Sequence, residues 1–197
     1  MNTEIEAKFV NINHDEIRQK LLDLGAKLEK PFRNMRRVTI DTPEMKAKNA
    51  FVRIRDEGEK VVITYKQFDQ NSVDGMKEIE VVVSHFEETI AIFAAAGLIQ
   101  GSYQESTRET WNLRNAEIVL DTWPWLNPYI EIEANDIKTV KSTAKLLDLK
   151  WSDAVFGDVM AAYKVQYPHL GQRDTVGNIA EVRFNDPLPD LLKNTKG

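Results

Sequence analysis

The chain has 197 residues, of which 42% are hydrophobic, so it is long enough to bury a sizeable core as one domain. Its 26 basic and 31 acidic side chains nearly cancel to a net charge of −5, which argues against a nucleic-acid partner. The absence of cysteine excludes disulfides, zinc–thiolate sites, iron–sulfur clusters and a cysteine nucleophile. The sequence shows no leader and no membrane-spanning stretch, so we expect a cytoplasmic protein with no membrane partner.

A charged strand followed by an amphipathic helix is predicted at the start of the chain. Residues 4–10 alternate between charged and apolar side chains, so one strand face carries Glu4, Glu6 and Lys8. Asn13 followed by Glu16 is a capping box, which predicts a helix start. Apolar residues then recur at helical spacing until Gly25, where the helix is expected to end.

The same order of strand and helix recurs twice, each time after a Glu-Ile-Glu segment. Glu78-Ile79-Glu80 leads to a predicted capping box at Ser84 and Glu87 and then to a helix that ends at Gly97. Glu131-Ile132-Glu133 leads to a helix with an apolar stripe between Ile137 and Leu147. The spacings are unequal, so this repetition does not indicate a solenoid.

Further strands are predicted between these units, joined by short turn motifs rich in Asp, Asn, Gly and Pro, among them Asp41-Thr42-Pro43 and Asp74-Gly75. They span residues 35–41, 51–55, 60–66, 103–113 and 116–122. Adjacent strands with tight turns favour an antiparallel sheet. We therefore predict an α+β fold, an eight-stranded antiparallel β-barrel (tunnel) with amphipathic helices packed outside. Residues 1–167 would form this domain, and residues 168–197 a C-terminal tail with one short edge strand within 179–184.

Basic and acidic side chains share the polar faces of several predicted strands. Arg53 lies two residues before Arg55, and Thr64 two residues before Lys66. Carboxylates gathered in a barrel lumen would need cations as partners, either Arg and Lys side chains or a divalent metal. Guanidinium groups beside oxygen ligands for a metal suit a polyphosphate. An ordinary β-rich domain with a salt-bridged surface is the structural alternative.

An ordered series of motifs resembles the CYTH proteins, also called triphosphate tunnel metalloenzymes. This family includes class IV adenylate cyclases, thiamine triphosphatases and inorganic tripolyphosphatases. The similarity covers about residues 1–165 and is carried by these segments: Glu4-Ile5-Glu6-Ala7-Lys8, Ile40-Asp41-Thr42-Pro43, Val52-Arg53-Ile54-Arg55, Thr64-Tyr65-Lys66, Glu78-Ile79-Glu80, Thr107-Arg108, Val119-Leu120-Asp121 and Tyr129-Ile130-Glu131-Ile132-Glu133.

The resemblance implies a role for each group of charged residues. Substrate phosphates would be bound by the basic residues Lys8, Arg37, Arg53, Arg55, Lys66 and Arg108. One or two Mg²⁺ or Mn²⁺ ions would be held by the carboxylates of Glu4, Glu6, Asp121, Glu131 and Glu133. The catalytic set would comprise Glu131, Glu133, Arg55 and Lys66. Glu78 and Glu80 would line the tunnel and hold basic neighbours in position.

The resemblance leaves three functions open. The first is divalent-metal-dependent hydrolysis of tripolyphosphate, thiamine triphosphate or a nucleoside triphosphate. The second is a class IV adenylate cyclase, although the His-Phe pair that precedes the first motif in cyclases is absent before Glu4. The third is a polyphosphate- or nucleotide-binding protein without catalysis, because Met76 and Ser106 stand where the family often has basic residues. Asn127-Pro128 also departs from the family pattern, and the sequence does not define an oligomeric state.

Overall fold

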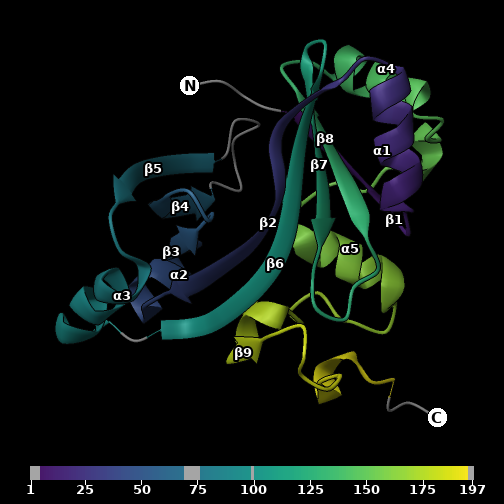
Figure 1. The fold of residues 1–197 in the computed structure, drawn as a ribbon. Helices are drawn as coiled ribbons and strands as arrows, with labels where there is room; N and C mark the ends of the chain where they lie inside the picture. Colours follow the sequence, from purple (N-terminus) through teal and green to yellow (C-terminus); the bar gives the residue numbers. More distant parts are fainter. Residues whose placement is uncertain (1–4, 69–75, 99, 195–197) are drawn as a thin grey trace. The chain divides into compact units, whose positions relative to one another are not determined.

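The computed structural model describes residues 5–68, 76–98 and 100–194 (Figure 1). Glu4 and the turn predicted at Asp74-Gly75 lie outside these residues. The main strands in the described ranges are β1 Ile5–Val10, β2 Lys27–Ile40, β3 Ala50–Asp56, β4 Val61–Phe68, β5 Met76–Val83, β6 Gln100–Leu113, β7 Ala116–Thr122 and β8 Tyr129–Ala134. The α-helices there are α1 His14–Asp23, α2 Pro43–Ala47, α3 Phe86–Ala95, α4 Ile137–Leu146 and α5 Val159–Gln166.

The eight strands form a sheet in the order β1-β8-β7-β6-β2-β3-β4-β5. Strand pairs joined by short connections are antiparallel, as in β3–β4, β4–β5 and β6–β7. The first strand pairs antiparallel with the last of the eight, so that Lys8 lies opposite Glu131. The predicted antiparallel α+β architecture with eight strands is confirmed.

The chain divides into two compact units. Unit 1 comprises residues 1–33, 107–174 and 184–197, and unit 2 comprises residues 34–106 and 175–183. The long strands β2 and β6 therefore contribute residues to both units. None of the helices in the described part of the chain has the length and apolar composition needed to cross a membrane.

The core of unit 1 lies between one face of its strands and two helices. The side chains of Phe9 and Ile132 lie on this face. They form one buried cluster with Leu21 of α1 and Val140 of α4. Figure 1 shows both helices beside the strands of this unit. Because side chains alternate along a strand, burying Ala7 and Phe9 here places Glu6 and Lys8 on the opposite face.

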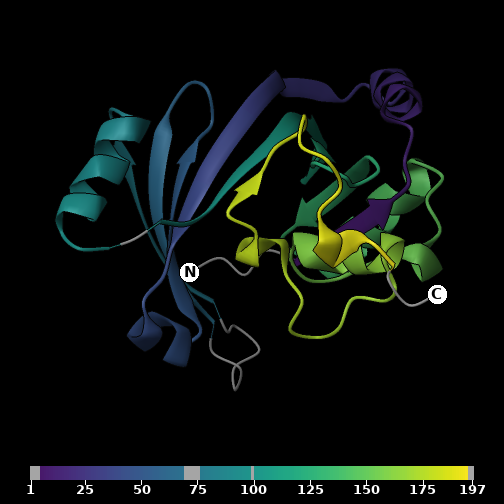
Figure 2. The same ribbon diagram turned by 90° about the horizontal axis from the view of Figure 1, so that it is seen from below.

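The core of unit 2 has the same arrangement, with α3 and Met45 of the short helix α2 packed against its strands. Val38 and Ile54 are fully buried in a cluster that includes Phe86 at the start of α3, and Phe93 of α3 packs against it. Figure 2 shows α3, coloured teal, alongside strands of this unit. The predicted amphipathic helices thus cover the apolar faces of the strands within each unit.

The first helix begins as the sequence predicts. The Asn13 side chain accepts hydrogen bonds from the backbone N–H groups of Asp15 and Glu16. Its side-chain amide also donates to Glu16 Oε1 at 3.2 Å, so the Glu16 carboxylate contacts the side chain of the N-cap residue and not the backbone N–H of Asn13. We expect Asn13→Ala to lower the free energy of unfolding by about 1 kcal/mol, because these N–H groups lose their acceptor. Chemical denaturation would measure this, and Asn135→Ala, in a loop outside any helix, is a comparison variant.

Two helix predictions need correction. His85, not Ser84, is the N-cap of α3, and its side chain makes no capping hydrogen bond. The helix therefore starts one residue later, and Glu87 instead contacts Arg36 Nη1 at 2.6 Å. The predicted turn around Pro43 is a short helix, α2, because Thr42 accepts from Met45 N and proline suits the first helical position.

The C-terminal segment packs on both units through short elements. A 3₁₀ turn at Val176–Asn178, the strand β9 Glu181–Val182 and a 3₁₀ turn at Asp190–Leu192 follow one another. Val182 is fully buried within unit 2, and Leu192 is buried within unit 1. The short strand predicted within residues 179–184 is therefore present as β9.

Candidate functional site

The polar face of unit 1 carries charged residues from four adjacent strands. Glu6 and Lys8 on β1 lie opposite Glu133 and Glu131 on β8. Arg108 on β6 lies opposite Asp121 on β7. We call these six residues the carboxylate face. All of them were predicted as site residues, and the register places them on the face that points away from the core cluster.

Lys8 is the most deeply buried cation of the carboxylate face, with 2% of its surface exposed. Its Nζ lies 2.7 Å from Glu6 Oε1 and 3.2 Å from Glu131 Oε1. Burial alone would lower the pKa of Lys8, but the charges of Glu131 and Glu6 outweigh burial and raise it. Lys8 therefore stays protonated and holds both carboxylates.

Arg108 binds two carboxylates of the same face. Its Nε and Nη2 donate to the two oxygens of Asp121 at 2.8 and 2.5 Å, and Nη2 also lies 3.3 Å from Glu131 Oε2. Burial opposes the charge on Arg108, but Asp121 and Glu131 hold its pKa well above the usual value. Glu131 thus has one oxygen on Lys8 and the other on Arg108.

Asp121 is held by a third residue that sequence reasoning did not select. Its side chain is 1% exposed, and Tyr129 Oη donates to Asp121 Oδ2 at 3.3 Å. Burial raises the pKa of Asp121, and the Arg108 charge opposes this shift. Tyr129 stands two residues before Glu131, so strand alternation was the signal that places it on the carboxylate face.

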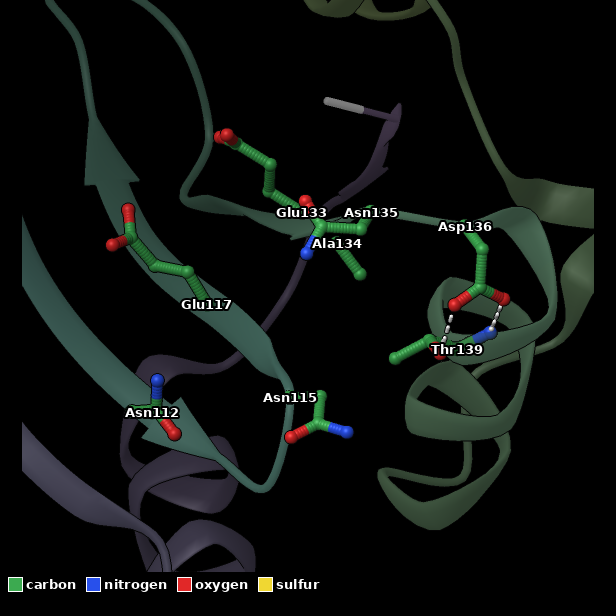
Figure 3. A pocket seen from close by; sticks show the side chains of 8 residues that line it. All are labelled: Asn112, Asn115, Glu117, Glu133, Ala134, Asn135, Asp136 and Thr139. Carbon is green, nitrogen blue, oxygen red and sulfur yellow. Dashed lines mark hydrogen bonds between the residues drawn. The ribbon is translucent and has the colours of Figure 1, made fainter. Parts of the chain in front are cut away.

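A cavity of about 390 Å³ lies at the end of the carboxylate face (Figure 3). It is lined by Asn112, Asn115, Glu117, Glu133, Ala134, Asn135, Asp136 and Thr139. Glu117 lies opposite Glu133 in the β7–β8 pair, whereas Asp136 caps α4 by accepting from Thr139 N at 2.8 Å. Among the described residues that line the cavity there is no Lys or Arg, and three are acidic: Glu117, Glu133 and Asp136. Glu117 was not among the predicted residues.

The polar face of unit 2 carries most of the predicted phosphate ligands. Arg53 Nη2 lies 3.5 Å from Thr64 Oγ1, which donates to Glu80 Oε2 at 3.2 Å. On the same strands, Lys66 Nζ lies 3.5 Å from Glu78 Oε1. Glu78 and Glu80 thus connect to basic side chains on one sheet face, which we call the basic face.

Arg37 and Arg55 also belong to the basic face. Arg55 lies two residues after Arg53 on β3 and so shares its face, and Arg37 on β2 lies opposite Arg55. Arg55 Nη2 pairs with Glu57, and its buried Nε has no hydrogen-bond partner among the described residues. Burial and the neighbouring Arg53 charge lower the pKa of Lys66, although Glu78 opposes them. Several cations on one face, only partly balanced by carboxylates, form a suitable binding surface for an anion.

The CYTH domain profile matches residues 2–151 of the chain. This protein belongs to the CYTH family. Comparison with curated proteins gives no match.

Solved structures of CYTH proteins share the fold. The PH1012 protein from Pyrococcus horikoshii is 25% identical, with a TM-score of 0.63 over 77% of this chain and 94% of that chain. A "putative adenylate cyclase" from Vibrio parahaemolyticus is 13% identical, with a TM-score of 0.66 over 80% and 95%. Hippeastrum HpAC1, a "putative adenylyl cyclase" described as having a dominant triphosphatase activity, is 15% identical, with a TM-score of 0.51 over 73% and 85%.

The carboxylate face of this CYTH protein has the donor chemistry that Mg²⁺ or Mn²⁺ requires. Carboxylate oxygens are the preferred ligands of these hard cations. In the described residues, which leave out Glu4, no three carboxylates or imidazoles lie close enough together to hold one ion. Glu131 and Asp121 bind Lys8 and Arg108 instead. The carboxylates therefore have the right chemistry to bind a divalent cation. In this structure, the side chains of Lys8 and Arg108 contact the same carboxylate oxygens.

Proposed function

We propose that this CYTH protein is a divalent-metal-dependent triphosphatase. The observation that carries the proposal is Glu131, whose two carboxylate oxygens are shared between the cations of Lys8 and Arg108. Alternating carboxylates and cations on one buried face suit a ligand that brings its own negative charge together with a metal ion. A triphosphate bound with Mg²⁺ or Mn²⁺ is such a ligand.

The basic face would bind the phosphate chain. Arg37, Arg53 and Arg55 present planar donors that match phosphate oxygens, and Lys66 adds a point charge. A phosphate would offset the repulsion between Lys66 and Arg53 that lowers the pKa of Lys66 in the free protein. Because these hydrogen-bond donors are already in position before the reaction, they would stabilise charge on the non-bridging phosphate oxygens without a rearrangement of the site.

The carboxylate face would hold the metal through Glu6, Asp121, Glu131 and Glu133, together with Glu4. A bound divalent ion would neutralise part of the phosphate charge and polarise phosphate oxygens. Lys8 orients Glu6 and Glu131, and Arg108 orients Asp121 and Glu131. Water attacks the terminal phosphorus and the bond to the bridging oxygen breaks, so tripolyphosphate yields orthophosphate and pyrophosphate. Glu133, at the acidic end of this face, accepts the proton of the attacking water.

A panel of triphosphates tests the proposal. Tripolyphosphate, thiamine triphosphate, ATP and GTP would each be incubated with Mg²⁺, Mn²⁺ or Ca²⁺, with released phosphate and cyclic nucleotide measured in parallel. We expect phosphate release from at least one substrate, and we expect excess EDTA to abolish it. Full activity in EDTA would contradict the metal requirement. Cyclic AMP with pyrophosphate would indicate a cyclase, and tight binding without turnover would indicate a binding protein.

A further inference from the structure

Arg37 is connected to the C-terminal segment through two buried polar side chains of β6. Arg37 Nε donates to Gln104 Oε1 at 2.7 Å, and Gln104 Nε2 donates to Ser102 Oγ at 3.1 Å. Ser102 Oγ in turn donates to the carbonyl oxygen of Ile179 at 2.6 Å. Ser102 is fully buried and Gln104 is 2% exposed, so solvent does not compete for these hydrogen bonds.

The backbone carbonyl of Ile179, in the C-terminal segment, sets the direction of each hydrogen bond that leads from this segment to Arg37. A serine hydroxyl has one hydrogen, and Ser102 uses it on Ile179 O, so it can only accept from Gln104. Gln104 must therefore turn its NH₂ group to Ser102 and its carbonyl oxygen to Arg37. The guanidinium of Arg37 is thus held at Nε by an acceptor whose orientation is fixed from the C-terminal segment.

The acceptor on Arg37 Nε is the neutral amide of Gln104, whereas two other arginines are held by carboxylates. Arg108 is held by Asp121 and Glu131, and Arg36 by Asp56 and Glu87, all of them carboxylates. An amide restricts the rotation of a guanidinium without neutralising its charge. Gln104 therefore orients Arg37 on the face that also carries Arg55.

Backbone pairing keeps the C-terminal segment in place. Tyr103 N donates to Ala180 O at 2.9 Å, and β9 pairs in parallel with β6, so that Gln104 lies opposite Val182. Arg183 adds contacts to Glu105 and to the ring of Tyr103. These residues all belong to unit 2, but residues 179–183 lie outside the part of the chain that the CYTH profile matches.

We propose that residues 179–182, acting through Ser102 and Gln104, position Arg37 for binding phosphate. This inference rests on the proposed function, because it takes Arg37 as a phosphate ligand. Ser102 and Gln104 are positioning residues, since neither needs to touch the substrate. The C-terminal segment would thereby tune the affinity of a site whose ligands come from the family domain.

The test combines Ser102→Ala, Arg37→Ala and the double variant, with Ser142→Ala as a matched control. Ser142 lies on the exposed side of α4 and donates only to the Thr139 carbonyl. The first readout is the Kd for tripolyphosphate with Mg²⁺, measured by calorimetry. The second is the hydrogen-exchange rate of Arg37 Nε–H, measured by NMR, which needs no ligand. Circular dichroism confirms that each variant is folded.

We expect Ser102→Ala to weaken tripolyphosphate binding about fivefold, as one lost hydrogen bond would, and to speed exchange of Arg37 Nε–H. It should have no further effect on affinity in the Arg37→Ala background. Gln104→Glu should weaken binding more, because a carboxylate neutralises Arg37. Unchanged exchange in Ser102→Ala, or an equal loss of affinity in the Arg37→Ala background, would overturn the inference. If Arg37→Ala binds like the unmodified protein, the phosphate role of Arg37 fails, whereas the exchange readout still decides the positioning.

Discussion

Glu131→Gln is expected to reduce triphosphate hydrolysis by about 10²- to 10³-fold, the range seen when one preorganised electrostatic group is removed from an active site. Glu131 bridges Lys8 and Arg108 with its two oxygens. A glutamine keeps the shape but offers a single acceptor and no charge, so the metal affinity and the orientation of both cations should suffer. We expect kcat to fall more than substrate affinity. Steady-state kinetics at several metal concentrations would measure both effects.

The matched control for Glu131→Gln is Glu88→Gln. Glu88 is exposed on the first turn of α3, the helix that packs against the apolar cluster of unit 2. The same change of charge there should leave kcat and KM within about twofold. If Glu131→Gln retained nearly full activity in metal-saturated assays, the carboxylate face would not be the site of metal-dependent hydrolysis.

Arg108→Leu is expected to lower the free energy of unfolding by about 3 kcal/mol, because it leaves the buried carboxylate of Asp121 without its partner. Arg108 donates twice to Asp121, whereas the Tyr129 hydroxyl donates only once. One neutral hydrogen bond cannot offset the cost of burying that charge. Urea denaturation at pH 7 would measure the loss.

A second variant separates the buried charge from lost packing. Arg108→Leu combined with Asp121→Asn removes both charges, so we expect it to recover most of the stability lost in Arg108→Leu alone. A double variant that is no more stable than Arg108→Leu would show that packing of the arginine stem, and not the unpaired carboxylate, causes the loss.

Strand alternation made much of the carboxylate face predictable from the sequence. Period-two patterning alone assigns Glu6 and Lys8 to one face of β1, and the structure buries Ala7 and Phe9 on the other. The same alternation places Arg53 with Arg55 on one face of β3, and Thr64 with Lys66 on one face of β4. What alternation cannot supply is register, because the pairing of Lys8 with Glu131 joins residues more than a hundred positions apart.

Residues that break the pattern escaped prediction for physical reasons. Glu109 is 5% exposed on the core side of β6, where its oxygens accept from Arg18 Nε at 2.9 Å and Trp111 Nε1 at 2.6 Å. A carboxylate on an apolar face is tolerated only with such partners. Here they are Arg18 on α1 and Trp111, the next core-facing residue along β6. Gln104 and Ser102 escaped as well, because their role depends on a C-terminal segment that has no charge pattern of its own.

The outer edge of β1 has a consequence for how this domain can be isolated. Lys8 N donates to Val155 O at 2.8 Å, and Val155 N donates to Lys8 O at 2.9 Å, so residues after the matched region 2–151 cover this edge. A fragment cut at residue 151 would expose those backbone groups of Lys8, which is flanked along β1 by the apolar residues Ala7 and Phe9. Exposed strand edges recruit other chains, so such a fragment should self-associate, whereas a fragment extended beyond Val155 keeps the edge covered.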